Sequence, residues 1–139
     1  GLPVWLSVSV HDRQGHLLRS GEPLEDLRRL VETYQPAAVL ANCSVPEAMG
    51  DALAVLGSFG KPFGAYANGF THISDGFLAD APTVAELTHR HDLTPEKYAD
   101  FALGWVAQGA TIVGGCCDVG PAHIAALAAR LRDAGHEIV

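Results

Sequence analysis

The sequence predicts an α/β fold in which parallel strands are covered by helices. Two observations carry this prediction. Four short apolar runs have the length and partly β-branched composition of strands, and a segment with helical periodicity follows each of them. Strand and helix therefore alternate four times, which is typical of parallel sheets flanked by helices. The predicted strands are residues 4–10, 37–41, 62–67 and 110–114.

The first two helices have recognisable start and stop signals. An apolar stripe over residues 24–34 predicts the first helix, with Ser20 as a candidate cap. The second should begin near Ser44, because Ser44 and Glu47 have capping-box spacing. Gly57 should end it.

The last two helices are delimited in the same way. Thr94 precedes Pro95 in a sequence typical of a helix N-terminus, and Gly109 should stop that helix. The final helix should follow Pro121 and end at Gly135.

This pattern fits either a small open doubly wound fold or half of an eight-stranded β/α barrel, and periodicity leaves both open. The connections after strands are long, residues 11–21 and 68–93, whereas those from helix to strand are only a few residues. Loops after strands form the functional face in both architectures. We therefore expect the chemistry at the carboxyl ends of the strands.

Composition narrows the classes of function. A chain of 139 residues, 48% hydrophobic and 18% charged, has material for one modest core, so we expect one unit over residues 1–139. The net charge of −7 and the absence of a basic run argue against nucleic acid or an acidic membrane as partner. No apolar run approaches the roughly 20 residues of a membrane span, and no signal peptide stands out. We expect a cytoplasmic protein.

The three cysteines follow two of the predicted strands, Cys43 after the second and Cys116 with Cys117 after the fourth. An odd number without a secretory signal argues against a disulfide framework. Three convergent thiolates suit zinc and leave its fourth position open for water or substrate. Two adjacent ligands require the chain to leave strand geometry, which Gly114 and Gly115 would permit.

Other interpretations of these residues stay open at this point. Free cysteine often fills protein cores, which would account for Cys43 alone. A disulfide between Cys116 and Cys117 would be strained. His123, at the start of the last helix, fits a local structural role better than that of a fourth ligand. Asn42 is the first non-cysteine candidate for a contact near the metal or the substrate.

Three strings resemble the homocysteine S-methyltransferase family: ANCS at residues 41–44, GGCC at 114–117 and GPAHIAAL at 120–127. In that family an Asn-Cys after one strand and a Gly-Gly-Cys-Cys after the last strand bind zinc. The resemblance covers essentially the whole chain, but only the second half of the family's barrel. It implies four β/α units resembling the C-terminal half of a (β/α)8 TIM barrel, with Cys43, Cys116 and Cys117 as zinc ligands.

The resemblance also implies an activity, that of a zinc-dependent methyltransferase of methionine biosynthesis. Zinc would hold the thiol of homocysteine, or a related thiol or selenol, as the anion that attacks the methyl of a sulfonium or ammonium donor. The partners would be homocysteine and a methyl donor whose identity these residues do not set. No side chain is assigned as a catalytic residue, because the protein sulfurs act as ligands.

The chain also departs from the family. After the third strand, members commonly read Tyr-Pro-Asn-Ser-Gly-Glu, and here only Tyr66 and Asn68 match. With Asn42, these are the predicted substrate-binding residues. The first four β/α units, with the acidic groups that hold the amino acid part of homocysteine, have no counterpart here. We therefore expect a fragment of a longer chain, or two copies closing against each other, and an isolated segment that is inactive.

A second interpretation belongs to a different class. The zinc could be structural, or the segment could be a scaffold or interaction module without independent catalysis. A structural site should be closed by a fourth protein ligand, with histidine as the candidate, and its loss should unfold the chain.

Overall fold

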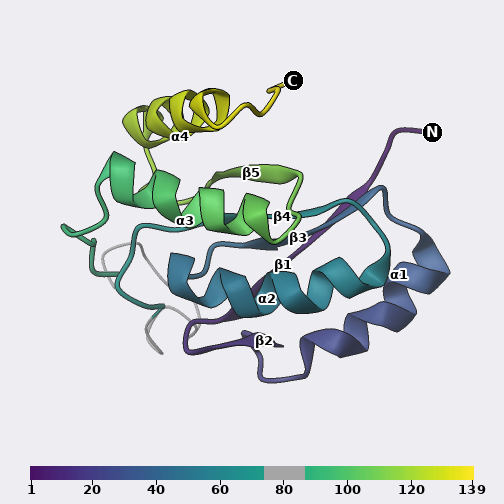
Figure 1. The fold of residues 1–139 in the computed structure, drawn as a ribbon. Helices are drawn as coiled ribbons and strands as arrows, with labels where there is room; N and C mark the ends of the chain where they lie inside the picture. Colours follow the sequence, from purple (N-terminus) through teal and green to yellow (C-terminus); the bar gives the residue numbers. More distant parts are fainter. Residues whose placement is uncertain (74–86) are drawn as a thin grey trace.

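The computed structural model describes residues 1–73 and 87–139, in which strands and helices alternate (Figure 1). The strands are β1 (Trp5–His11), β2 (Gln14–Leu18), β3 (Ala38–Asn42), β4 (Phe63–Ala67) and β5 (Ile112–Gly115). The α-helices are α1 (Arg28–Tyr34), α2 (Met49–Leu56), α3 (Pro95–Ala107) and α4 (Pro121–Asp133). Short 3-10 turns flank the first two helices, at Leu24–Leu27, Pro46–Ala48 and Gly57–Phe59.

Within the described residues the strands form one sheet in the order β2-β1-β3-β4-β5. The last four strands in this order are parallel, with Val8, Ala41, Ala65 and Val113 in one row across them. They coincide with the four predicted strands, so the predicted α/β class is confirmed. The mostly parallel sheet is consistent with part of a TIM barrel.

The strand β2 was not predicted. It lies in the segment 11–21, which the sequence indicates as a loop, and pairs antiparallel with β1 through Val10 and Leu18. Its five residues are too short and too polar to give a clear alternating pattern. Gly15 is buried beneath α2, where an added Cβ would overlap the carbonyl oxygen of Ala48. Of the other long connection, residues 74–86 lie outside the described part.

The helix termini agree with the predictions in part. Thr94 caps α3, its hydroxyl accepting from the amide of Lys97 at 3.2 Å. The predicted capping box of Ser44 and Glu47 is not formed, because the buried Ser44 hydroxyl bonds with the backbone of Val10 instead. Ser20 does not cap the first helix either, since its first turn begins after Pro23.

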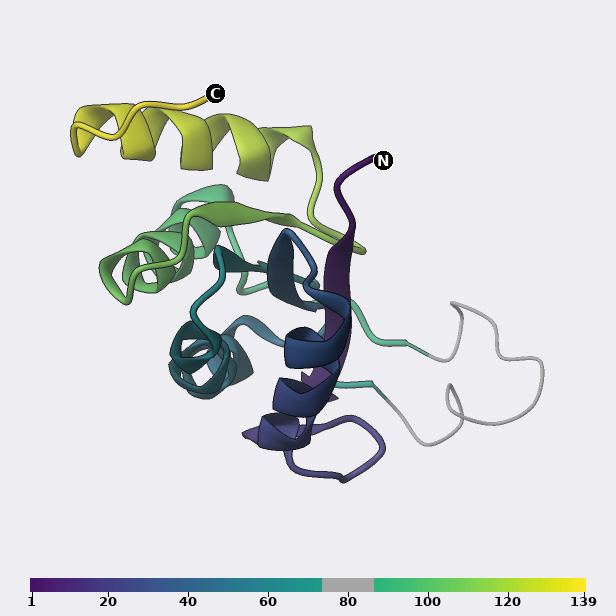
Figure 2. The same cartoon turned by 90° about the vertical axis from the view of Figure 1, so that its right-hand side faces the viewer.

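The core lies between the sheet and the two helices α2 and α3, which gather on the same side of β1 (Figure 2), while α4 packs along α3 (Figure 1). Val10, Met49, Leu53 and Tyr98 are at most 1% exposed. The opposite face of the sheet carries a different set of residues, among them Ser7, Ser9, Asn42 and Tyr66. In the part of the chain described, no helix is long and apolar enough to cross a membrane.

Candidate metal centre

The three cysteines meet where β3 and β5 end. The Sγ atom of Cys117 lies 3.7 Å from that of Cys43 and 3.8 Å from that of Cys116, and all three lie within 4.8 Å of one another. Sulfurs bound to one tetrahedral zinc ion at about 2.3 Å stand about 3.8 Å apart. The donor set and its spacing therefore fit zinc.

A turn lets the adjacent cysteines share this point. The amide of Cys116 donates to Ala67 at 2.9 Å, so Cys116 still continues the pairing of β5 with β4. The chain then turns back, with the amide of Val119 donating to the Cys116 carbonyl at 3.1 Å and Asp118 at a φ of 63°. Gly115 remains in the strand. Gly115 was expected to let the backbone leave strand geometry. Instead it makes room for a neighbour, because a Cβ there would overlap the side chain of Val119.

Cys43 adopts an uncommon conformation for a residue with a side chain. Its φ is 46°, in the left-handed region. Its amide donates to the carbonyl of Tyr66 at 3.0 Å, and its own carbonyl accepts from Arg19 Nη2 at 2.8 Å and from Asn68 Nδ2 at 3.0 Å. These bonds hold the backbone that orients the Cys43 sulfur toward the other two.

The surroundings of Cys43 and Cys117 favour their neutral thiol form. Burial raises the pKa of both Cys43 and Cys117, and in each case a neighbouring thiol raises it further. Metal binding must therefore displace protons from these sulfurs, so metal affinity should increase with pH.

Two of the predicted substrate residues lie in one row of the sheet next to the cysteines. Asn42 and Tyr66 are register partners on β3 and β4, and Ser9 is paired with Asn42 on the other side. The Ser9 hydroxyl donates to Asn42 Oδ1 at 3.4 Å, and the Tyr66 hydroxyl donates to Ser7 Oγ at 2.6 Å. This row is polar and half-buried. Substrate binding by Asn42 and Tyr66 stays a prediction.

Asn68, the third predicted substrate residue, is completely buried. Its Nδ2 donates to the Cys43 carbonyl, its Oδ1 accepts from the amide of Phe70 at 3.2 Å, and its own amide donates to Ser44 at 3.0 Å. These contacts make Asn68 a support for the loop of Cys43. A contact with substrate also stays a prediction.

His123 has a local role. Its Nδ1 accepts from the amide of Gly120 at 3.2 Å, so Nε2 carries the proton and donates to the carbonyl of Leu93 at 3.0 Å. Its ring packs edge-on against Tyr98. In residues 1–73 and 87–139 the cluster of metal-ligand side chains consists of the three cysteines, without a histidine or carboxylate.

Sequence reasoning missed Arg19, which supports the loop of Cys43. Arg19 bonds both Cys43 and Ser44, and the Asp12 carboxylate accepts from the amides of Val45 at 3.1 Å and Ile73 at 2.7 Å. The sequence of a polar loop does not show that one of its arginines is half-buried and bonded to a distant loop. The only signal was the position of the loop after a strand on the functional face.

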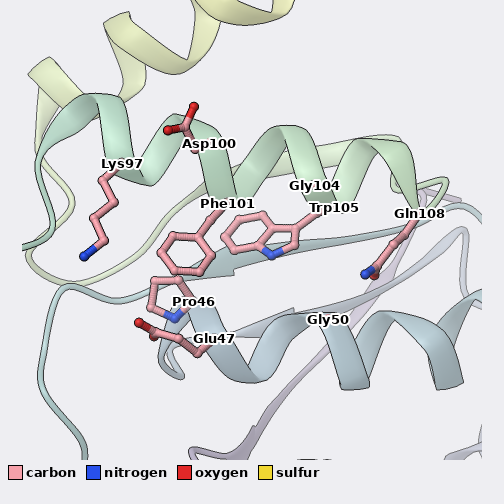
Figure 3. Close-up of a pocket in the computed structure, with 9 residues that line it drawn as sticks. All are labelled: Pro46, Glu47, Gly50, Lys97, Asp100, Phe101, Gly104, Trp105 and Gln108. Atoms are coloured by element: carbon pink, nitrogen blue, oxygen red, sulfur yellow. The ribbon is translucent and has the colours of Figure 1, made fainter.

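Away from the cysteines, a groove lies on the outer side of the helical layer, between α2 and α3 (Figure 3). It encloses about 400 Å³ above the side chains of Pro46, Phe101 and Trp105. Three charged residues at its rim have ion-pair partners, at N–O distances of 2.7 to 3.1 Å: Glu47 with Arg90, Lys97 with Asp92, and Asp100 with Arg130. Among the described residues that line this groove, none is a cysteine and each charged side chain is in an ion pair.

Comparison with known proteins identifies the family of this chain. The sequence model of the family described as homocysteine S-methyltransferase matches residues 1–131. The chain belongs to the homocysteine S-methyltransferase family. The resemblance seen in the cysteine strings is thereby confirmed.

Three relatives illustrate the relationship. A homocysteine S-methyltransferase of Escherichia coli is 34% identical over 91% of this chain, a selenocysteine methyltransferase of Astragalus bisulcatus 28% over 86%, and a homocysteine S-methyltransferase of Zea mays 26% over 98%. The chain spans between 33% and 38% of the length of these relatives.

Proposed function

We propose that this chain supplies the zinc-binding part of a methyltransferase that transfers a methyl group to the thiol of homocysteine. The observation that carries the proposal is the convergence of the Cys43, Cys116 and Cys117 sulfurs at the carboxyl ends of two strands, at spacings that fit zinc. The E. coli relative is a homocysteine S-methyltransferase, and the Astragalus relative acts as a selenocysteine methyltransferase. Their names support a thiol or selenol as acceptor.

The residues of the chain would have distinct tasks. The three cysteines would hold zinc, which when bound keeps an acceptor thiol deprotonated near neutral pH. The row of Asn42 and Tyr66 borders Cys43 on the same edge of the sheet and would contact the acceptor. Methyl-donor selection would lie with residues that this segment does not identify.

A catalytic zinc is favoured over the structural alternative. A structural site is usually closed by four protein ligands, and the described cluster has three. His123, the candidate for a fourth, is occupied by two backbone groups. These observations support a zinc site whose fourth coordination position is open for the acceptor thiol.

We also propose that the segment acts together with further structure, either the rest of a longer chain or a second copy. The family's acidic groups for the amino acid part of homocysteine have no counterpart here, so methyl transfer by the isolated segment should be negligible. The cytoplasmic location stays a prediction.

Metal analysis and one substitution test this function. The reduced full chain should contain zinc at a near-stoichiometric level. Cys116→Ala should lose the metal. In the complete enzyme, meaning the longer chain or the dimer proposed above, it should also abolish methyl transfer to homocysteine, assayed with a panel of sulfonium, ammonium and folate methyl donors. Ser20→Ala, at an exposed loop position, is the control. Zinc-free wild-type protein, together with unchanged methyl transfer by Cys116→Ala, would exclude the proposal.

A further inference from the structure

A half-buried arginine reaches from the β1–β2 hairpin to the loop that carries Cys43. Arg19 directly follows β2, and its side chain is 18% exposed. One nitrogen, Nη2, donates to the Cys43 carbonyl at 2.8 Å and to the Ser44 hydroxyl at 2.9 Å. Arg19 thus contacts the backbone of one proposed zinc ligand from a point 24 residues earlier in the chain.

The arginine is itself fixed in place. Its backbone amide donates to the Ser9 carbonyl at 3.0 Å, and its guanidinium lies 3.7 Å from the carboxylate of Asp12, whose side chain is 12% exposed. Asp12 in turn accepts from the amide of Val45 at 3.1 Å. The hairpin and the cysteine loop are therefore joined by a continuous set of polar contacts.

The contact is placed where Cys43 needs support. A left-handed conformation is unfavourable for a residue with a Cβ, so Cys43 should relax from its φ of 46° if its carbonyl were released. Rotation of that backbone would swing the sulfur away from Cys117. Among the residues that the structure describes, the side chains of Arg19 and Asn68 hold this carbonyl.

We propose that Arg19 is a positioning residue, which keeps the Cys43 sulfur directed at the metal through its hydrogen bond to the Cys43 carbonyl. This inference rests on the proposed zinc site and deepens it. Groups that orient metal ligands commonly contribute about 10- to 100-fold to metal affinity. Arg19 acts through the backbone of the ligand, and we expect about tenfold.

The test compares Arg19→Met and Arg19→Lys with Arg29→Met and Arg29→Lys in the full chain. Arg29 is exposed on α1, so its variants remove or keep the same charge away from the site. Zinc affinity is measured by competition with a chromophoric chelator. The cobalt-substituted protein reports the number of bound thiolates through its sulfur-to-cobalt charge-transfer absorption.

Arg19→Met should bind zinc about tenfold more weakly than Arg29→Met, and its cobalt spectrum should lose the share of charge-transfer intensity that one of three thiolates supplies. Arg19→Lys keeps the charge beside Asp12 but has no planar fork, so it should fold and show an intermediate loss. If Arg19→Met does not fold, the zinc affinity and cobalt spectrum of Arg19→Lys test the role of Arg19. A merely structural role would not change the cobalt spectrum.

Equal zinc affinities and identical cobalt spectra in the Arg19 and Arg29 variants would overturn the role of Arg19 and leave the proposed function intact. A wild-type chain that binds neither zinc nor cobalt would overturn the proposed function itself, and this inference with it.

Discussion

The hydroxyl of Tyr98 joins helix α3 to β4 and to β5, the strand that leads to Cys116 and Cys117. Tyr98 is completely buried, and its hydroxyl donates to the Gly114 carbonyl at 2.7 Å and accepts from the amide of Ala67 at 3.0 Å. Burial raises its pKa, so the phenol stays neutral and able to donate. One side chain thus serves the ends of both β4 and β5.

We expect Tyr98→Phe to lower the free energy of unfolding by about 1–3 kcal/mol, because it leaves a buried amide and a half-buried carbonyl without this partner. Urea denaturation measures the change. Tyr34→Phe is the matched control, since Tyr34 is 76% exposed. Equal losses in the two variants would show that the Tyr98 hydroxyl contributes no net stability.

At the residue scale the sequence predicts the cysteine cluster better than the residues that support it. Cysteine is rare and chemically specific, so the convergence of Cys43, Cys116 and Cys117 could be predicted from the strands they follow. Arg19 and Asn68 support Cys43 through hydrogen bonds that span 24 and 25 residues, and no local pattern encodes such contacts. Ser44 shows the same limit, because its long-range bond with Val10 replaces the predicted cap.

At the scale of the elements, the position of β2 depends on the close contact of Gly15 with the chain at the start of α2. Gly15→Ala should destabilise the protein by about 1–3 kcal/mol, because the added methyl has no room against the Ala48 carbonyl. Gly104→Ala is the opposite case, at an exposed helix position with nothing within 4 Å of the new Cβ. There we expect a gain of about 0.5–1 kcal/mol.

Urea denaturation of both glycine variants checks this contrast. A Gly15→Ala chain as stable as the wild type would mean that β2 can move away from α2 without loss. The register of the hairpin, and with it the position of Arg19, would then be less constrained than its contacts indicate.

Sequence periodicity detected some of the strands and helices and missed others. Four apolar strands and the capped helix α3 were predictable, because their patterns are long and agree with their burial. The hairpin was not, because a strand of five largely polar residues is stabilised by its pairing with β1 rather than by its own propensity.

At the scale of the whole molecule, the face of the sheet opposite α2 and α3 is a candidate surface for association. That face carries Trp5, which is 56% exposed, together with the half-buried row of Ser9, Asn42 and Tyr66 that borders the cysteines. Parallel sheets are ordinarily covered on both faces, and an aromatic side chain so exposed favours association.

We therefore predict that the isolated 139-residue chain self-associates, with Trp5 at the contact. Analytical ultracentrifugation over a range of concentrations should show a dimer or larger species, and Trp5→Ser should shift the equilibrium toward monomer. Leu30→Ser removes another exposed apolar side chain, on α1 and 46% exposed, and serves as control because it should leave the equilibrium unchanged. A chain that stays monomeric at all concentrations and transfers methyl groups rapidly would contradict both this prediction and the expected need for further structure. The substrate site would then have to be built from the residues of this segment alone.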